Sequence, residues 1–154
     1  MSKVVCYFSC SGVTKSMASI ISDTIGADIF EIEPSISYTS EDLDWTNKNS
    51  RSSIEMSDKS SRPSIKSSGD ISKYDTVIIG FPVWWYTAPT IINTFIESNN
   101  FDVKKVYIFV TSGSSSVDSS FNDLKIKYPN IDFISGKRFT VGVTKEDILS
   151  WLNN

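Results

Sequence analysis

Three short segments of this 154-residue chain combine polar or aromatic side chains with a position directly after an apolar run. The first consists of Ser9, Cys10, Ser11, Gly12, Val13 and Thr14. It places hydroxyl groups on both sides of one glycine, just before a segment with helical periodicity. Hydroxyls, free backbone amides and the positive end of a helix dipole together suit a phosphate group. We therefore predict a phosphate-binding loop here; the alternative is an ordinary polar turn with a serine cap.

The residues that this loop lacks narrow the kind of phosphate it would bind. Gly12 stands alone, whereas triphosphate and dinucleotide loops need further glycines at fixed spacing. A cysteine-phosphatase loop needs an arginine at a fixed distance after its cysteine, and the corresponding residues are Ser16 for Cys10 and Gly12 for Cys6. The sequence therefore favours a monophosphate that is held without reacting.

Two further segments follow later apolar runs. The second segment is residues 81–89, with Pro82, Val83, Trp84, Trp85 and Tyr86 as candidate cofactor contacts. The third is residues 111–116, with Thr111, Ser112, Gly113 and Ser114 as candidate contacts. Neighbouring side chains diverge, so three consecutive aromatic rings cannot all face one core, and an exposed tryptophan favours a planar ligand or a partner. The small residues of the third segment allow a ring to approach the backbone closely. Together the segments predict a pocket with a phosphate cradle, an aromatic wall and a polar rim.

Apolar runs alternate with helical patterns along the chain. Strands are expected at residues 3–8, 27–32, 74–81, 105–111 and 131–135, with helices after the first, third, fourth and fifth of them. In the first helix we expect Val13, Met17, Ile20, Ile21 and Ile25 to form the buried face. Pro89 is expected in the first turn of the second helix, and Thr144 to cap the last with Asp147 in a capping box. This alternation predicts an α/β fold with a parallel sheet covered by helices on both faces.

One connection, residues 33–73, is far longer than is usual. Its first part, residues 40–45, is expected to form a capped helix. The serine-rich residues 50–72 are expected to form a partly irregular excursion over the surface. We expect no second domain in this connection, and we therefore expect residues 1–154 to form a single domain.

Composition excludes several classes of function. The chain has no histidine, which removes every mechanism that needs an imidazole base or ligand. Its net charge of −3 and lack of a basic run argue against nucleic acid and anionic membranes. Four extended residues separate the Cα atoms of Cys6 and Cys10 by roughly 13 Å, whereas a disulfide needs them within about 7 Å, so we expect no bridge unless the segment turns sharply. Cys10, at a helix start, either has a lowered thiol pKa or is an inert loop residue, the interpretation we favour. No signal peptide or membrane span is evident, so we expect a cytoplasmic protein.

In order and spacing, several motifs resemble those of the flavodoxin-like FMN proteins. They are YFSxSGxTK at residues 7–15, GADIFEI at 26–32, the Arg62-Pro63 pair, GFPVWWYTAP at 80–89 and VTSGSS at 110–115. The resemblance implies a three-layer sandwich with strand order 2-1-3-4-5 and non-covalent FMN, its phosphate on the first segment and its isoalloxazine between the other two. Tyr86, Ser114 and Ser116 stand where glycines are expected, and they add bulk beside the ring.

This resemblance implies a redox protein that carries electrons between partner proteins, as a monomer or homodimer. No candidate general acid or base stands out, which fits a carrier. Two alternatives remain open: an NAD(P)H-dependent FMN reductase acting on quinones or similar acceptors, and a binding module of the same fold that holds FMN weakly or not at all.

Overall fold

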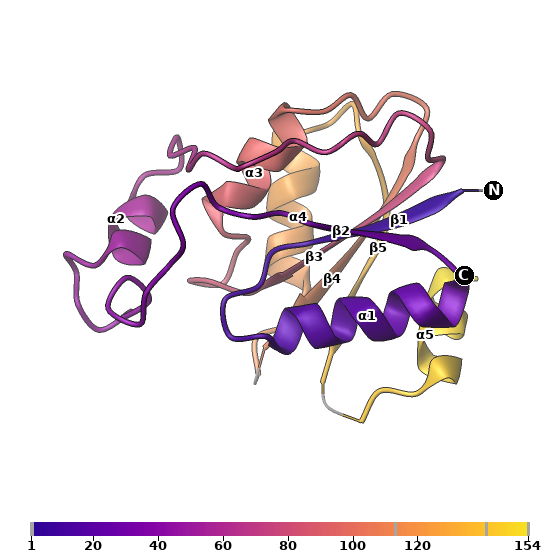
Figure 1. The fold of residues 1–154 in the computed structure, drawn as a ribbon, viewed down its shortest axis with the longest axis horizontal. Helices are drawn as coiled ribbons and strands as arrows, with labels where there is room; N and C mark the ends of the chain where they lie inside the picture. Colours follow the sequence, from indigo (N-terminus) through magenta and orange to yellow (C-terminus); the bar gives the residue numbers. More distant parts are fainter. Residues whose placement is uncertain (1, 113, 141, 154) are drawn as a thin grey trace.

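A five-stranded, wholly parallel sheet forms the centre of the protein, as seen in a computed structural model that describes residues 2–112, 114–140 and 142–153 (Figure 1). Its strands are β1 (Lys3–Tyr7), β2 (Asp28–Glu31), β3 (Thr76–Pro82), β4 (Lys105–Thr111) and β5 (Asp132–Phe139). They lie in the order β2-β1-β3-β4-β5, and every neighbouring pair is parallel. The expected fold class and strand order are confirmed.

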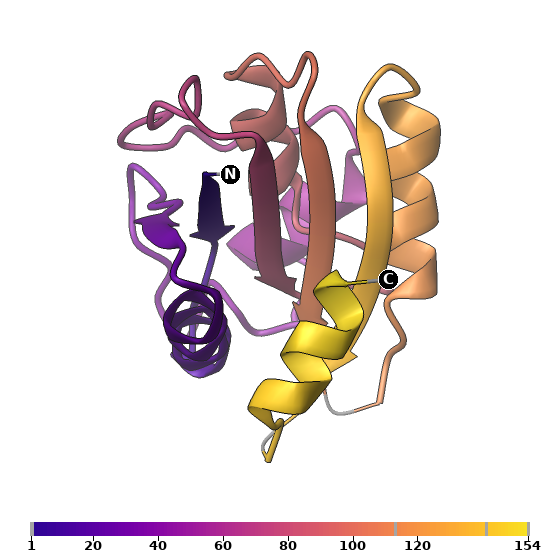
Figure 2. The same ribbon diagram turned by 90° about the vertical axis from the view of Figure 1, so that its right-hand side faces the viewer.

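Four helices cover the two faces of this sheet. Helices α1 (Val13–Ile25) and α5 (Lys145–Leu152) lie on one face, and α3 (Thr90–Glu97) and α4 (Asp118–Lys127) on the other (Figures 1 and 2). Side chains alternate along each strand, so Cys6 joins the α3 side of the core while Val5 and Tyr7 join the α1 side. No described helix is long and apolar enough to cross a membrane.

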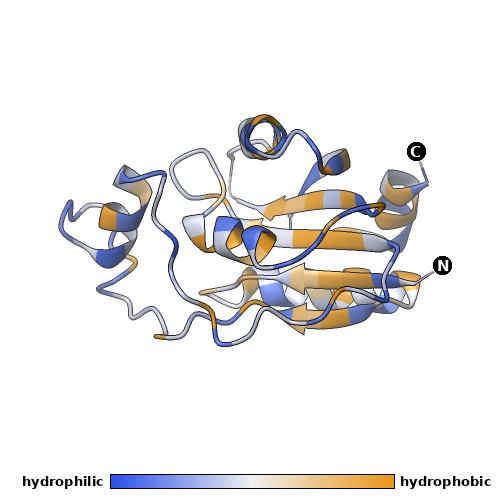
Figure 3. Cartoon of the chain, turned by 90° about the horizontal axis from the view of Figure 1, so that it is seen from above, coloured by the Kyte–Doolittle hydropathy of each residue, from blue (hydrophilic) through white to orange (hydrophobic). Residues whose placement is uncertain are grey.

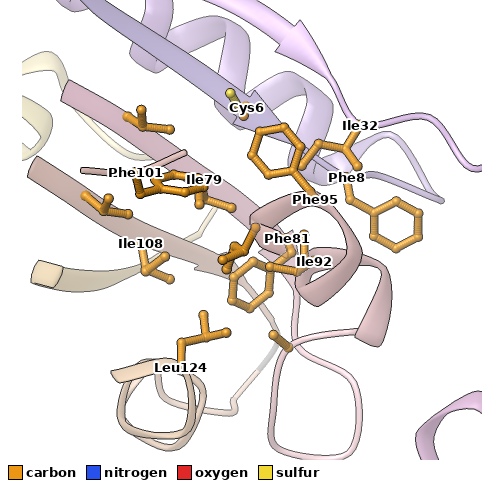
Figure 4. Packing of buried hydrophobic residues seen from close by; sticks show 14 of the residues in the cluster. Cys6, Phe8, Ile32, Ile79, Phe81, Ile92, Phe95, Phe101, Ile108 and Leu124 are labelled. Atoms are coloured by element: carbon orange, nitrogen blue, oxygen red, sulfur yellow. The ribbon is translucent and has the colours of Figure 1, made fainter. Parts of the chain in front are cut away.

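The larger of the two core clusters lies under α3. Phe81, Ile92 and Phe95 pack there with Phe8, close to the strand ends from which the three polar or aromatic segments leave (Figure 4). Hydropathy along the chain matches this arrangement, because the central strands are mostly hydrophobic and the α2 region mostly hydrophilic (Figure 3). The apolar strands therefore fix the ends of the loops that follow them.

Helix ends follow the expected signals closely. The capping box of Thr144 and Asp147 is confirmed, with hydrogen bonds of 3.1 and 3.0 Å. Pro89 precedes α3 as its N-cap, one residue outside the expected position. In α1 the buried face is rotated from the expected one: Val13 and Ile20 are exposed. The small residues Thr14, Ala18 and Ser22 face the sheet there, because they allow the helix to approach it closely.

The edge strand β5 is longer than the predicted residues 131–135. Polar residues of an edge strand can face solvent, so Lys137 and Arg138 continue the strand to the buried Phe139. A register shift relative to β4 lies between Val106 and Tyr107.

The long connection between β2 and β3 contains its helix in a different place from the one expected. Residues 40–45 form only turns, in which Thr39 and Asp42 exchange two hydrogen bonds of 2.9 and 3.1 Å. The helix is α2 (Arg51–Ser57), within the stretch expected to be irregular, and the Ser50 hydroxyl accepts from the Ser53 amide at its start. The expectation erred because short serine-rich helices have little periodicity and depend on tertiary contacts.

Several pairs hold this connection against the body of the protein. Pro34, near its start, pairs with Ile65 in an isolated antiparallel bridge. Arg62 makes a bidentate ion pair with Glu97 of α3, with both N···O distances 3.0 Å. These contacts join the two arms that flank α2 and tie the returning arm to α3, which leaves α2 beside the carboxyl ends of the strands (Figure 1).

Candidate cofactor site

A cavity of about 710 Å³ lies at the carboxyl ends of the strands, where ligands of open parallel sheets bind. The predicted residues that line it are Cys10, Ser11, Pro82, Val83, Trp84, Trp85, Tyr86 and Ser114. The volume is in the range typical of small-molecule sites. All three predicted segments therefore contribute to one cavity.

The phosphate loop is organised around Gly12. Its φ of 91° is left-handed, a conformation that glycine adopts without the penalty of a Cβ. The Gly12 amide donates to the Ser9 hydroxyl at 3.1 Å, and its carbonyl accepts the first hydrogen bond of α1 from Ser16. The amides of Val13, Thr14 and Lys15 lie in the first helical turn, where no helix carbonyl precedes them. These amides and the exposed Ser11 hydroxyl are the groups that suit a phosphate.

Thr14 has a different role from that of Ser11. Its side chain is buried, and its hydroxyl lies 2.7 Å from that of Thr111, the last residue of β4. This hydrogen bond fastens the first turn of α1 to the strand end beside it. Of the described residues, the predicted contacts that are not part of the cavity lining are Ser9, Gly12, Val13, Thr14, Thr111 and Ser112. Val13 and Thr14 follow the lining residue Ser11 in the first turn of α1.

The aromatic segment forms a tight hairpin. Trp84 and Thr87 exchange two backbone hydrogen bonds of 3.0 Å, with Trp85 and Tyr86 at the tip. These two residues have φ values of 48° and 65°, the pattern of a type I′ turn that usually holds asparagine and glycine. Large side chains in this conformation cost of order 1–2 kcal/mol each. The hairpin is therefore strained, and strain of this kind is concentrated at functional sites.

As expected, the three aromatic rings lie in different environments. Trp84 packs inward in edge-to-face contacts with Phe8 and Tyr38, at centroid distances of 5.6 and 5.5 Å. Trp85 and Tyr86 remain 44% and 74% exposed. One ring thus anchors the hairpin to the core, and two are presented outward.

The connection beyond β2 also lines the cavity, and Arg51, next to the lining residue Ser52, holds this part of the connection together. Its guanidinium lies 3.7 Å from the centre of the Tyr38 ring, pairs with Glu55 at 3.1 Å and donates to the Ile36 carbonyl at 2.8 Å. The Tyr38 hydroxyl also donates to Glu55, at 2.5 Å. Because Arg51 is used in these contacts, it fixes the wall of the cavity.

The third segment supplies a polar edge. The Ser112 hydroxyl donates to the Ser115 carbonyl at 2.5 Å, and the Ser112 carbonyl accepts from Arg138 at 3.0 Å. Ser114 is exposed and lines the cavity, whereas Gly113 lies outside the described residues. The Val83 amide donates to the Thr111 carbonyl at 3.3 Å, which joins this segment to the aromatic one.

Cys10 is an inert member of the loop. Burial raises the pKa of its thiol to about 12, and the nearby Arg51 guanidinium only partly offsets that effect. The side chain packs against the core cluster. A thiol of this kind remains protonated near neutrality, so a lowered thiol pKa at the helix start is not found.

Three lining residues were missed in the sequence: Leu43, Trp45 and Ser52. Trp45, in a serine-rich and acidic stretch, was a detectable signal, because an exposed tryptophan there has no core to fill. Nothing in the sequence distinguishes Ser52 from its many neighbouring serines. In the structure its hydroxyl is buried without a hydrogen-bond partner, a costly state that a polar ligand group can relieve. Free amides, aromatic walls and this orphan hydroxyl fit a cofactor with a phosphate and a planar ring.

Known proteins share this fold over the whole chain. A candidate flavoprotein from Bacteroides eggerthii is 44% identical, with a TM-score of 0.95 over 99% of this chain and 96% of that one. A second, from Bacteroides uniformis, is also 44% identical, with a TM-score of 0.94 over 99% and 98%. A Lactobacillus acidophilus flavoprotein solved in complex with FMN is 22% identical, with a TM-score of 0.77 over 98% of each chain. No curated protein matches this chain.

The sequence profile of one family, described as Flavodoxin, matches residues 2–154. Since that match spans nearly the entire chain, the protein belongs to the flavodoxin family.

Proposed function

We propose that this protein binds FMN non-covalently and carries electrons between partner proteins. The proposal is carried by the cavity in which the phosphate loop, the aromatic hairpin and Ser114 meet at the carboxyl ends of β1, β3 and β4. Membership of the flavodoxin family supports it, as does the FMN bound by the similar Lactobacillus acidophilus flavoprotein.

Each part of the site has a separate task in this proposal. The Ser11 hydroxyl and the first-turn amides of α1 bind the phosphate, since each hydrogen bond to a charged group contributes about 1.5–3 kcal/mol. Trp84 and Trp85 form the apolar wall for the ring, and Ser52 donates or accepts a hydrogen bond at the cofactor's polar part. When bound, FMN supplies the electron chemistry, while the protein sets its exposure and potential.

The uncharged lining of the cavity favours electron transfer over demanding proton transfer. None of the described residues that line it is an aspartate, glutamate, lysine or arginine. A general acid or base for substrate chemistry is therefore missing from that lining, and Cys10 is kept protonated by burial. A carrier needs no such group.

The same neutrality predicts a low reduction potential. The lining offers no full positive charge to compensate the phosphate dianion or negative charge that develops on the reduced ring, and the chain has a net charge of −3. We expect a midpoint potential below that of free FMN, measured by dye-equilibrated spectroelectrochemical titration. A potential above that of free FMN would contradict this electrostatic argument.

Partner proteins are expected to dock over the exposed aromatic residues at the cavity. Trp45, Trp85 and Tyr86 line it and remain exposed, and aromatic residues with an apolar body and polar tip are favoured at interfaces. An exposed rim of this kind brings a partner close to the ring that it would reduce or oxidise.

The deciding experiment is a titration of the apoprotein with FMN and with riboflavin, followed by flavin fluorescence. We expect quenching at low micromolar concentration, with FMN preferred over riboflavin because only FMN has the phosphate. No binding of either flavin would support a binding module that has lost its cofactor. Steady NAD(P)H oxidation by the loaded protein alone, with quinone as acceptor, would instead favour the reductase.

A further inference from the structure

A second cavity, of about 440 Å³, lies on the other side of the aromatic hairpin. Trp85 and Tyr86 line both cavities. The remaining walls of the second come from Thr87 and Ala88, from α2 and Lys59 just after it, and from α3 and α4. None of the phosphate-loop residues lines it. The two aromatic residues at the strained tip therefore form a partition between two separate spaces.

The second cavity is charged, unlike the first. Lys59 and Lys127 line it from opposite segments, against one carboxylate, Asp123, which already accepts from the Thr87 hydroxyl at 2.7 Å. Among the residues that the structure describes, neither lysine is in an ion pair with a carboxylate. In an acidic protein these two ammonium groups make a local site for an anion.

The other residues that line this cavity favour an anion that carries a flat, apolar ring. Ile126 is 78% exposed although it lines the cavity, and Met56 and the rings of Trp85 and Tyr86 add further apolar surface. Exposed apolar side chains gathered at a concave surface mark a binding site. Aromatic walls prefer to stack on a planar ligand.

A buried hydroxyl completes the polar part of this cavity. Thr90, the first residue of α3, lines the cavity, and its hydroxyl is buried without a hydrogen-bond partner. A hydroxyl left in this state costs free energy that an accepting oxygen of a ligand would recover.

We propose that the second cavity binds a planar aromatic anion, with its ring against Trp85 and Tyr86 and its anionic group near Lys59, Lys127 and Thr90. This inference goes beyond the proposed FMN site and does not depend on it, because binding can be measured on the apoprotein. The shared partition places the two ligands on opposite sides of the same hairpin.

The test uses 2-naphthoate as the probe and 2-naphthalenemethanol as its neutral counterpart, both titrated calorimetrically into the full chain. We expect naphthoate to bind at least about threefold more tightly than the alcohol, because partly exposed ion pairs contribute a free energy of about that size. The double variant Lys59→Gln/Lys127→Gln should reduce naphthoate affinity to that of the alcohol and leave the alcohol unaffected. Lys125→Gln, on the same helix but outside the cavity, is the matched control and should change neither.

Two further measurements separate a binding role from a structural one. Thr90→Val should weaken naphthoate by about threefold or more while preserving or raising the melting temperature, because an unpaired buried hydroxyl is removed. Saturation with FMN should leave naphthoate affinity within about twofold, since the cavities are separate. Equal binding of the two probes, no binding of naphthoate, an equal effect of Lys125→Gln, or full competition by FMN would overturn the proposal. FMN affinity itself is measured separately, so failure of the proposed function would be distinguishable.

Discussion

The phosphate loop and the aromatic hairpin lie side by side at the same end of the sheet, yet they are built in opposite ways. The loop consists of small polar residues, and its one left-handed position is occupied by Gly12. The hairpin consists of large apolar residues, and its two left-handed positions are occupied by Trp85 and Tyr86. Backbone amides bind a phosphate best where small side chains leave them accessible. A planar ring is bound by aromatic side chains, so the backbone must hold those side chains in a defined orientation.

This difference shows where each region obtains its stability. The loop is held by hydrogen bonds: a local one from the Gly12 amide to Ser9, and one between Thr14 and the distant Thr111 at the end of β4. The hairpin bears a conformational cost of roughly 2–4 kcal/mol for two left-handed aromatic residues. The inward ring, Trp84, packs against Phe8 and Tyr38, and this packing offsets part of that cost.

The largest expected effect is therefore that of Trp84→Ala. Loss of the half-buried ring should lower the free energy of unfolding by about 2–3 kcal/mol, somewhat less than for a fully buried tryptophan. Urea denaturation followed by circular dichroism measures it. Trp45→Ala is the matched control, because that ring is 74% exposed and should cost less than about 0.5 kcal/mol. Equal losses in the two variants would show that Trp84 is not the anchor.

The parallel sheet and the position of the site could be predicted from the sequence because their signals are strong and local. Apolar runs and helical periods define the strands and covering helices, and the carboxyl ends of parallel strands meet at one edge. Both loops follow such strands directly, so their convergence follows from topology. The pairing of Thr14 with Thr111 could not be predicted, because it depends on atomic registry between elements far apart in sequence.

The wall supplied by the long connection was also beyond prediction. Residues 40–45 have a capping signal without enough buried residues to continue as a helix, whereas α2 is stabilised by Arg51 and its tertiary partners. The left-handed tip was unexpected for a related reason. Local propensity argues against Trp85 and Tyr86 in a type I′ turn, and tertiary packing of Trp84 overrides it.

The next largest effect separates the two hydroxyls of the phosphate loop. Ser11→Ala should weaken FMN about tenfold with little change in stability, since its exposed hydroxyl is expected to bind the charged phosphate. Thr14→Val should instead destabilise the fold by about 1–3 kcal/mol, because it leaves the buried Thr111 hydroxyl unpaired. Flavin fluorescence titration and urea denaturation of both variants test this contrast. Reversed results would place the phosphate on Thr14.

A smaller effect, on the pH dependence of stability, is expected from Cys10, a phosphate-loop residue whose side chain packs against the same core cluster as Trp84. Burial raises its pKa from 9.0 to about 12, with Arg51 lowering it and Glu55 raising it to lesser extents. In this range the unfolded chain binds fewer protons than the folded one, so this contribution to stability is complete below pH 9 and is lost as the pH rises towards 12. Tyrosines titrate there as well, so the measurement is the difference between wild type and Cys10→Ala at about pH 8 and about pH 10.5. Rapid reaction of Cys10 with a disulfide reagent at about pH 8 would contradict the raised pKa.

The smallest expected effect is a gain in stability from Tyr86→Asn. Asparagine tolerates the left-handed conformation, so the free energy of unfolding of this variant should be higher than that of the wild type by up to about 1 kcal/mol. Val103→Asn is the matched control: Val103 also has a positive φ, is fully exposed, and lines neither cavity. Both variants should gain stability in urea denaturation, but only Tyr86→Asn should weaken FMN and naphthoate, because it removes a ring shared by the two cavities. A loss of stability in Tyr86→Asn alone would mean that the exposed ring supports the hairpin by packing, and that the strain at its tip is smaller than its backbone conformation indicates.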